Sequence, residues 1–118
     1  MELRIAQTLE RLGRDPEAEA PYRAAIAGKD GDGALVPCGL HLMRRGQPEE
    51  ALGLLQRFVA VHPDDVDALM FLADGYAGAG RMNDAIQTAQ RARAEARARC
   101  DARTGELIDR RLSQYGAQ

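Results

Sequence analysis

Aromatic residues are scarce in this sequence. Its 118 residues include no tryptophan, three tyrosines and two phenylalanines, so aromatics make up only 4%. Hydrophobic residues still make up 45%, which is enough to form a buried core from aliphatic and small side chains. The abundance of Ala, Leu, Arg and Glu favours helices.

Long apolar runs and a large net charge are also absent. No apolar stretch approaches the roughly 18 residues that span a membrane, and no short apolar segment follows a basic N-terminus as in a signal peptide. The net charge of −2 is too small for a general nucleic-acid binder. We therefore expect a soluble, cytoplasmic domain whose partners are neither membranes nor nucleic acids.

Only two cysteines are present, Cys38 and Cys100, and they lie 62 positions apart. Zinc ligands come in close pairs and disulfide frameworks need more cysteines, so neither is expected here. The sequence points to a reducing compartment and implies no metal and no cofactor.

The sequence does contain an apolar pattern that repeats about every 34 residues. Each copy has the spacing of two helices joined by a glycine. One copy consists of Leu69, Leu72, Ala73, Tyr76, Gly80, Ala85, Ala89 and Ala92. The copy before it consists of Leu35, Cys38, Gly39, Leu42, Gly46, Ala51, Leu55, Phe58 and Pro63. A more degenerate first copy keeps Ile5, Ala6, Leu9, Gly13, Ala18, Tyr22 and Ala25.

This pattern resembles the tetratricopeptide repeat, a helix-turn-helix unit of 34 residues with the signature W-x2-L-G-x2-Y, A-x3-F, P. The resemblance covers about residues 1–99. The sequence departs from the family at Leu35 and Leu69, where the family often has tryptophan, and at Ala89, where it has a large aromatic residue. The resemblance implies a helical solenoid that binds partners on its concave side.

Glycine and proline mark the ends of the expected helices. Gly13, Gly46 and Gly80 follow periodic segments, where a residue that readily adopts positive φ ends a helix. Pro16 and Pro48 fit the first helical position. The sequence predicts helices over about 2–12, 16–28, 34–45, 48–61, 65–79, 82–99 and 103–115.

Two prolines conflict with this pattern because proline cannot donate a helical hydrogen bond. Pro21 should kink the second helix. Pro37 fits the third helix only if that helix begins within a few residues of it.

We predict an all-α, right-handed α-solenoid in a single domain. Its three helix-turn-helix repeats are expected over about 1–31, 32–65 and 66–99. The helix over about 103–115 has no partner in the repeat and should cap the last one, because polar residues cover the rest of its surface. The expected apolar stripe of this capping helix consists of Leu107, Ile108, Leu112 and Tyr115.

Candidate chemical groups have structural interpretations. The stretch Gly28–Gly33 lacks the serine or threonine of a phosphate loop and the ligands of a calcium loop, so it predicts a turn. The carboxylates that follow His62 fit helix caps, and His41 is assigned no role. Since no nucleophile, base and orienting group occur at a recognisable spacing, the chain is not expected to be an enzyme.

Basic residues gather near the C-terminal end of the pattern. Residues 81–118 carry a net charge of +3, against −5 for residues 1–80. The run consists of Arg91, Arg93, Arg97, Arg99 and Arg103. These residues do not share one helix face and have no interleaved aromatic for base stacking, so we interpret the run as a solvated, salt-bridged helix.

The concave side should carry residues that recur at i, i+4 and i+7 on the first helix of each repeat. These sets are Leu3, Gln7 and Glu10, then Val36, Leu40 and Met43, then Met70, Asp74 and Ala77. The middle of the surface is apolar and contains methionines, which suit a hydrophobic peptide or an amphipathic helix. Some family members clamp a peptide carboxylate with lysine, arginine and asparagine here, but those residues do not match in this chain.

We therefore predict a non-catalytic protein–protein interaction module that binds an apolar peptide or helix in its concave groove. The groove residues are Leu3, Gln7, Val36, Leu40, Met43, Met70 and Asp74. The alternative is a self-association or scaffold module of a larger multidomain protein, whose partner would be a second copy.

Overall fold

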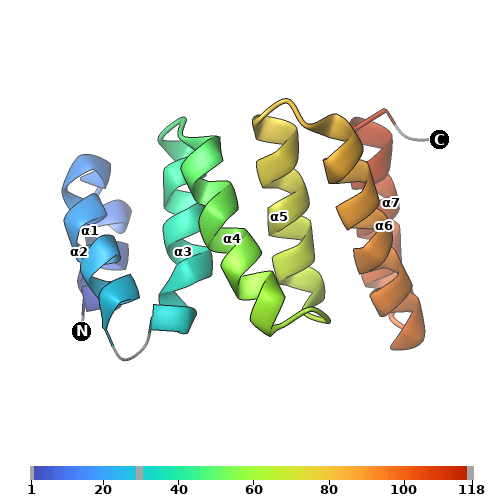
Figure 1. Ribbon diagram of the computed structural model, residues 1–118, viewed down its shortest axis with the longest axis horizontal. Helices are drawn as coiled ribbons and strands as arrows, with labels where there is room; N and C mark the ends of the chain where they lie inside the picture. Colours follow the sequence, from blue (N-terminus) through green and yellow to red (C-terminus); the bar gives the residue numbers. More distant parts are fainter. Residues whose placement is uncertain (1, 29–30, 117–118) are drawn as a thin grey trace.

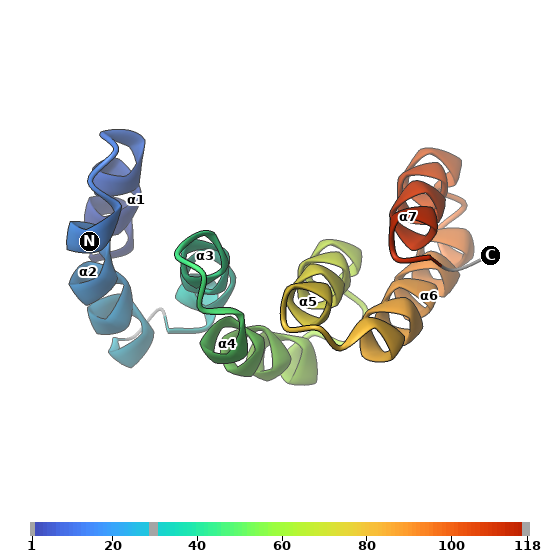
Figure 2. The ribbon, with the colours of Figure 1, turned by 90° about the horizontal axis from the view of Figure 1, so that it is seen from above.

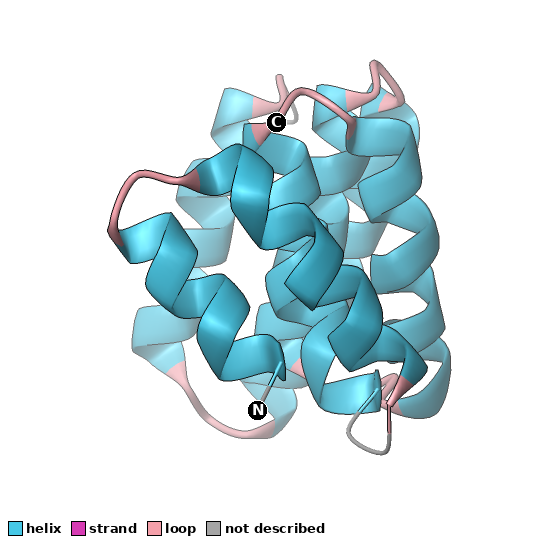
Figure 3. Cartoon of the chain, turned by 90° about the vertical axis from the view of Figure 1, so that its left-hand side faces the viewer, coloured by secondary structure: helices cyan, strands magenta, loops and turns pink. Residues whose placement is uncertain are grey.

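The computed structural model describes residues 2–28 and 31–116, which form seven α-helices and, within those ranges, no strand (Figure 3). The helices are α1 (Glu2–Arg11), α2 (Asp15–Ala27), α3 (Gly31–Arg44), α4 (Pro48–Val61), α5 (Val66–Gly78), α6 (Met82–Ala98) and α7 (Ala102–Gln114). The prediction of an all-α chain is confirmed, and most helix ends fall within one or two residues of those expected.

Consecutive helices lie side by side in an array that measures 40 × 27 × 23 Å (Figure 1). Viewed from above, α1, α3, α5 and α7 form an inner row and α2, α4 and α6 form an outer row (Figure 2). The array curves, so that α3 and α5 lie at the base of the concave side while α1 and α7 stand at its ends (Figure 2). This is the solenoid of helical hairpins that the repeat predicts.

The turns within the hairpins repeat one backbone geometry. Gly13, Gly46 and Gly80 have φ of +76°, +77° and +81°, a conformation that L side chains rarely adopt. In the third copy the Gly80 amide donates to the Ala77 carbonyl and the next amide donates back to Tyr76, which satisfies carbonyls at the end of α5. The helix stops predicted at these glycines are confirmed.

Small residues sit where the paired helices approach most closely. Ala18, Ala51 and Ala85 occupy the same place in the three copies, and each is fully buried. A Cβ placed on Gly39 of α3 would lie 3.1 Å from Cγ of Leu55 in α4, so this helix pair leaves little space for a side chain there. The register predicted from the repeat therefore agrees with the observed burial.

The third helix begins earlier than predicted. Helix α3 starts at Gly31 rather than near residue 34, so Pro37 lies well inside it rather than in its first turn. Asp32 lies in that first turn, where a carboxylate interacts favourably with the helix dipole. Helix α2 likewise continues past Pro21. Residues 29 and 30 of the predicted turn lie outside the described residues.

Helix α7 covers the last hairpin with three of the four residues expected to do so. Ile108, Leu112 and Tyr115 are buried and belong to the same core cluster as the alanines of α6. Leu107 does not share this role, because it is 56% exposed. It precedes Ile108 by one residue, which turns its side chain about 100° around the helix toward the concave side.

Candidate interaction surface

The predicted groove residues all lie on helices of the inner row. Leu3 and Gln7 are on α1 and Val36, Leu40 and Met43 are on α3, while Met70 and Asp74 are on α5. Gln7 is exposed and the other six are half-buried. Leu35 and Leu42 of α3 are fully buried and lie on a different face of the helix. The distinction that the sequence predicts between core and surface residues of α3 therefore agrees with the observed burial.

The apolar members of this set are held from one side by the core. Val36, Met43 and Met70 pack against buried clusters while part of each side chain stays accessible. Leu40, which lies between Val36 and Met43 in the sequence of α3, is also half-buried. The base of the concave side is therefore a preformed apolar surface built from α3 and α5.

A pocket of about 360 Å³ lies between α5 and α7. Its apolar lining consists of Val66, Met70, Leu107 and Ile108. The polar lining consists of Asp67, Thr104, Arg110, Arg111 and Gln114. Met70 was predicted on the concave side, but the contribution of α7 was not, because this helix was expected only to cap the last repeat.

Asp74 is tied to the capping helix. Its Oδ1 accepts a hydrogen bond of 2.5 Å from the Tyr115 hydroxyl and also pairs with the Arg111 guanidinium. Burial, followed by the adjacent Asp74 carboxylate, raises the pKa of Tyr115, and the bond to Asp74 raises the pKa of Arg111. Asp74 therefore fixes α7 against α5 at the rim of the concave side.

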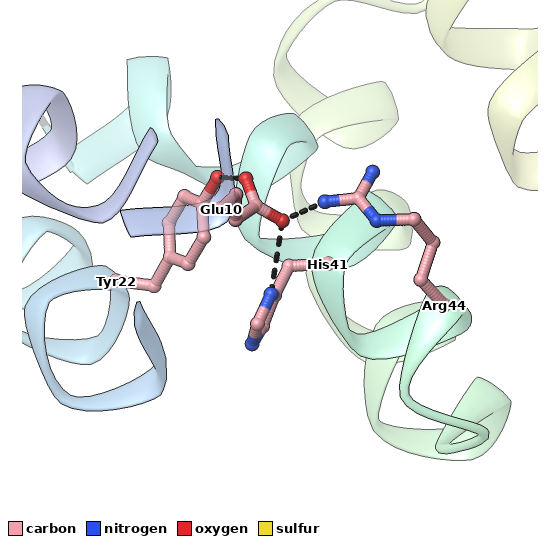
Figure 4. Close-up of polar contacts among 4 residues, drawn as sticks. All are labelled: Glu10, Tyr22, His41 and Arg44. Atoms are coloured by element: carbon pink, nitrogen blue, oxygen red, sulfur yellow. Dashed lines mark hydrogen bonds and ion pairs between the residues drawn. The ribbon is translucent and has the colours of Figure 1, made fainter. Parts of the chain in front are cut away.

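A second carboxylate, Glu10, ties the first hairpin to the second (Figure 4). It pairs with Arg44 of α3, and its Oε1 accepts a hydrogen bond from the Tyr22 hydroxyl of α2. Its Oε2 lies 3.0 Å from Nδ1 of His41, whose ring packs against Tyr22 at 5.0 Å between centroids. Glu10 is only 14% exposed, so this predicted concave residue is occupied by internal partners.

His41 is buried at the centre of this cluster with 1% exposure. Its Nε2 is buried without a partner among the described residues. Burial is the main cause that lowers the pKa of His41, Arg45 lowers it further, and Asp15 and Glu19 oppose the shift. His41 therefore has a packing role that its local sequence does not predict, since its partner Glu10 is 31 positions away.

Several side chains of chemically reactive types have structural surroundings. Burial raises the pKa of the Cys38 thiol to about 11, so it is not a ready nucleophile at neutral pH. Residues 2–28 and 31–116 contain no group of three or more His, Cys, Asp or Glu side chains able to hold a metal. The ring of His62 packs on that of Phe58 with 4.6 Å between the ring centroids. Asp65 caps α5 by accepting a hydrogen bond from the Ala68 amide.

The arginine run is partly neutralised by carboxylates from other helices and loops. Arg93 pairs with Asp109 of α7 at 2.8 Å, and Arg99 lies 3.7 Å from Asp64. These ion pairs fit the predicted salt-bridged helix. In the part of the chain that the structure describes, no helix is long and apolar enough to cross a membrane.

The sequence matches a known family model. The model, described as tetratricopeptide repeat, matches residues 39–99, which is more than half of the chain. The chain belongs to the tetratricopeptide repeat family. This confirms the family assigned from the repeat pattern. A comparison with curated proteins finds no match.

Tetratricopeptide repeat structures also share the fold. PcrH from Pseudomonas aeruginosa superposes with a TM-score of 0.82 at 15% identity, over 98% of this chain and 89% of PcrH. PcrH in complex with the chaperone binding region of PopD gives 0.80 at 14% identity, over 98% and 88% of the two chains. MamA from Desulfovibrio magneticus RS-1 gives 0.71 at 18% identity, over 98% and 73%. At these identities the likeness establishes the fold alone.

Proposed function

We propose that the chain is a non-catalytic protein–protein interaction module that binds an apolar peptide or amphipathic helix on its concave side. The observation that carries the proposal is the set of half-buried apolar side chains on α3 and α5, namely Val36, Leu40, Met43 and Met70. Because Val36, Met43 and Met70 pack against the core, a partner would lose less entropy in ordering them than at a mobile surface.

The pocket between α5 and α7 adds a place for one large apolar side chain. Met70 and Ile108 line this pocket. Ile108 belongs to the core cluster and Met70 packs against it, while Leu107 extends the apolar surface outward. Apolar side chains that fill a pocket with a polar rim are typical anchors of protein interfaces. The groove and this pocket would together accept an apolar segment with one bulky anchor.

The structural comparison supports the same class of function. PcrH, whose fold this chain shares, has been solved with the chaperone binding region of PopD. The same arrangement of helices can therefore hold a segment of another protein. For this chain we infer the chemical character of the partner, which is an apolar segment.

The test is affinity capture with matched variants. Leu40→Asp with Met70→Asp places two carboxylates on the inner row, where burial against an apolar partner is costly. Val61→Asp with Met82→Asp makes the same charge change at exposed apolar residues of the outer-row helices α4 and α6. Far-UV circular dichroism checks that each variant folds, and Leu40→Gln with Met70→Gln serves as a milder second variant.

We expect proteins retained by the wild-type chain to be lost with the inner-row variants and kept with the outer-row variant. Equal retention by all folded variants would place binding elsewhere and contradict the proposal. Light scattering over a range of concentrations tests the alternative of self-association, which predicts a mass that rises with concentration in the wild type and not in the inner-row variants.

A further inference from the structure

The N-terminal end of the array exposes an apolar edge of the first helix, and no other described helix packs on this edge. Ile5 is 47% exposed and Leu12 is 65% exposed. Leu12 directly follows the last residue of α1, and its amide still donates the helical bond to the Thr8 carbonyl. The two residues are seven positions apart and therefore lie on one face, with the exposed Thr8 between them. The buried face of α1 is a different one, centred on Ala6.

The repeat shows what normally covers this edge. Ile5, Cys38, Leu72 and Ile108 occupy the same place in the first helices, 33, 34 and 36 residues apart. Cys38 is 2% exposed in a cluster with Tyr22 of α2, and Leu72 is 4% exposed in a cluster with Leu55 of α4.

Ile108 of α7 completes this series at 1% exposure, in the cluster that contains Ala92 of α6. Each of the three later residues is thus buried with side chains of the second helix of the preceding hairpin. Ile5 is apolar like these three residues, but no described helix covers it.

Basic side chains line one side of this edge. Arg4 and Arg11 are exposed, lie seven residues apart, and neighbour the Ile5 and Leu12 face. No ion pair joins either arginine to a carboxylate within residues 2–28 and 31–116. A helix that covered the edge would therefore be favoured by acidic residues on its matching side.

A second copy of this chain fits the edge poorly. Each second helix is already covered by the next first helix, as α2 is by α3, α4 by α5 and α6 by α7. Two antiparallel α1 helices, related by a two-fold axis that runs across them, would bring the Arg4 and Arg11 side of one against the same side of the other. Repulsion between the arginines of the two copies would oppose association.

We propose that the Ile5–Leu12 edge of α1 docks an amphipathic helix from a different protein, with small or aliphatic residues on its buried face and carboxylates beside Arg4 and Arg11. The docked helix would take the place that α2, α4 and α6 take for the later hairpins. It would extend the outer row at the N-terminal end and leave the concave side free, so this site is separate from the proposed groove.

The probe for this proposal is a pair of designed helical peptides. Both carry Ala and Leu at i, i+3, i+4 and i+7, and their flanks carry either glutamate or lysine. Binding to the intact chain is measured by fluorescence anisotropy, and the location is measured by the loss of amide hydrogen exchange. The variants are Ile5→Ser with Leu12→Ser, Arg4→Glu with Arg11→Glu, and the control Val61→Ser, which removes an exposed apolar residue on α4.

We expect the glutamate peptide to bind about tenfold or more tightly than the lysine peptide, with slowed exchange in residues 2–12. Ile5→Ser with Leu12→Ser should abolish binding, Val61→Ser should not change it, and Arg4→Glu with Arg11→Glu should reverse the charge preference. Three results would overturn the proposal: no binding or no charge preference, slowed exchange in α3 and α5 instead, or a concentration-dependent dimer of the chain that Ile5→Ser removes.

Discussion

The two ends of the array differ in what they offer to a neighbour. Ala6, Gly39 and Ala73 are the small buried residues that let each first helix approach its own second helix. In α7 the same place holds Asp109, which is 53% exposed and paired with Arg93. The C-terminal end therefore presents a charged residue, whereas the N-terminal end presents the apolar Ile5.

This difference shows that the same place in the repeat can be core or surface, depending on whether a neighbouring helix packs on it. Burial of an apolar residue is decided by the neighbouring helix and not by the residue alone. Packing a further helix on that place would take the Asp109–Arg93 ion pair out of water, which is costly. The predictions below test how far the two ends differ.

Removal of the terminal helices should give the largest effect, and an unequal one. Truncation after Ala102 removes the buried Ile108, Leu112 and Tyr115, which we expect to cost about 5 kcal/mol and to cause aggregation. Deletion of residues 1–13 removes one fully buried residue, Ala6, and several half-buried ones, so its cost should be smaller. Urea unfolding and light scattering measure both, and equal losses of stability would contradict the asymmetry of the ends.

The two carboxylate ties should also differ. Glu10→Ala leaves the buried His41 and the Tyr22 hydroxyl without their partner, which we expect to cost about 2–3 kcal/mol. Asp74→Ala releases Tyr115 and the partly exposed Arg111, to which water has access, so about 1–2 kcal/mol is expected. Chemical denaturation gives both values, and a larger loss for Asp74→Ala would show that the C-terminal tie matters more.

The interior of the hairpins should behave alike at both ends. Ala18 and Ala85 are both fully buried where paired helices meet. We expect Ala18→Leu and Ala85→Leu each to cost about 1–3 kcal/mol through overpacking. The exposed Ala20 and Ala94 provide matched controls, since leucine there adds the same volume at the surface. Unchanged denaturation midpoints for both buried variants would show that the repeat register is wrong.

The smallest effect is expected at the turn before the capping helix. Cys100 has φ of +57° where the turns within the hairpins have glycine, and its amide donates to the Arg97 carbonyl. Cys100→Gly should therefore raise the free energy of unfolding by about 0.5–1 kcal/mol. Gly80→Ala makes the opposite change in the same conformation and should lower it. A destabilised Cys100→Gly variant would show that the backbone entropy glycine adds to the unfolded chain outweighs the strain it relieves at this exposed turn.

The sequence predicted the features that depend on neighbours within one repeat. Glycines that need positive φ, such as Gly46 and Gly80, and small residues such as Ala51 follow from local backbone and packing requirements. Apart from Tyr22, the partners of Glu10 and Asp74 could not be predicted, because they lie 31 to 41 positions away beyond the residue's own hairpin.

The pocket between α5 and α7 was missed for a related reason. Its lining depends on how the capping helix rotates around its axis, and a stripe of apolar letters does not fix which of two adjacent residues turns inward. Leu107 and Ile108 show this directly, since one is exposed and the other is buried. Only the packing against α6 decides between them.

The most direct test of the concave surface is a methyl-labelled methionine NMR titration with a segment of a protein that the wild-type chain captures. Met43 and Met70 lie on the inner row, and the exposed Met82 at the start of α6 lies on the outer row as an internal control. Binding on the concave side predicts shifts in the Met43 and Met70 methyl signals while the Met82 signal stays in place. A shift of Met82 with unchanged Met43 and Met70 signals would contradict the account.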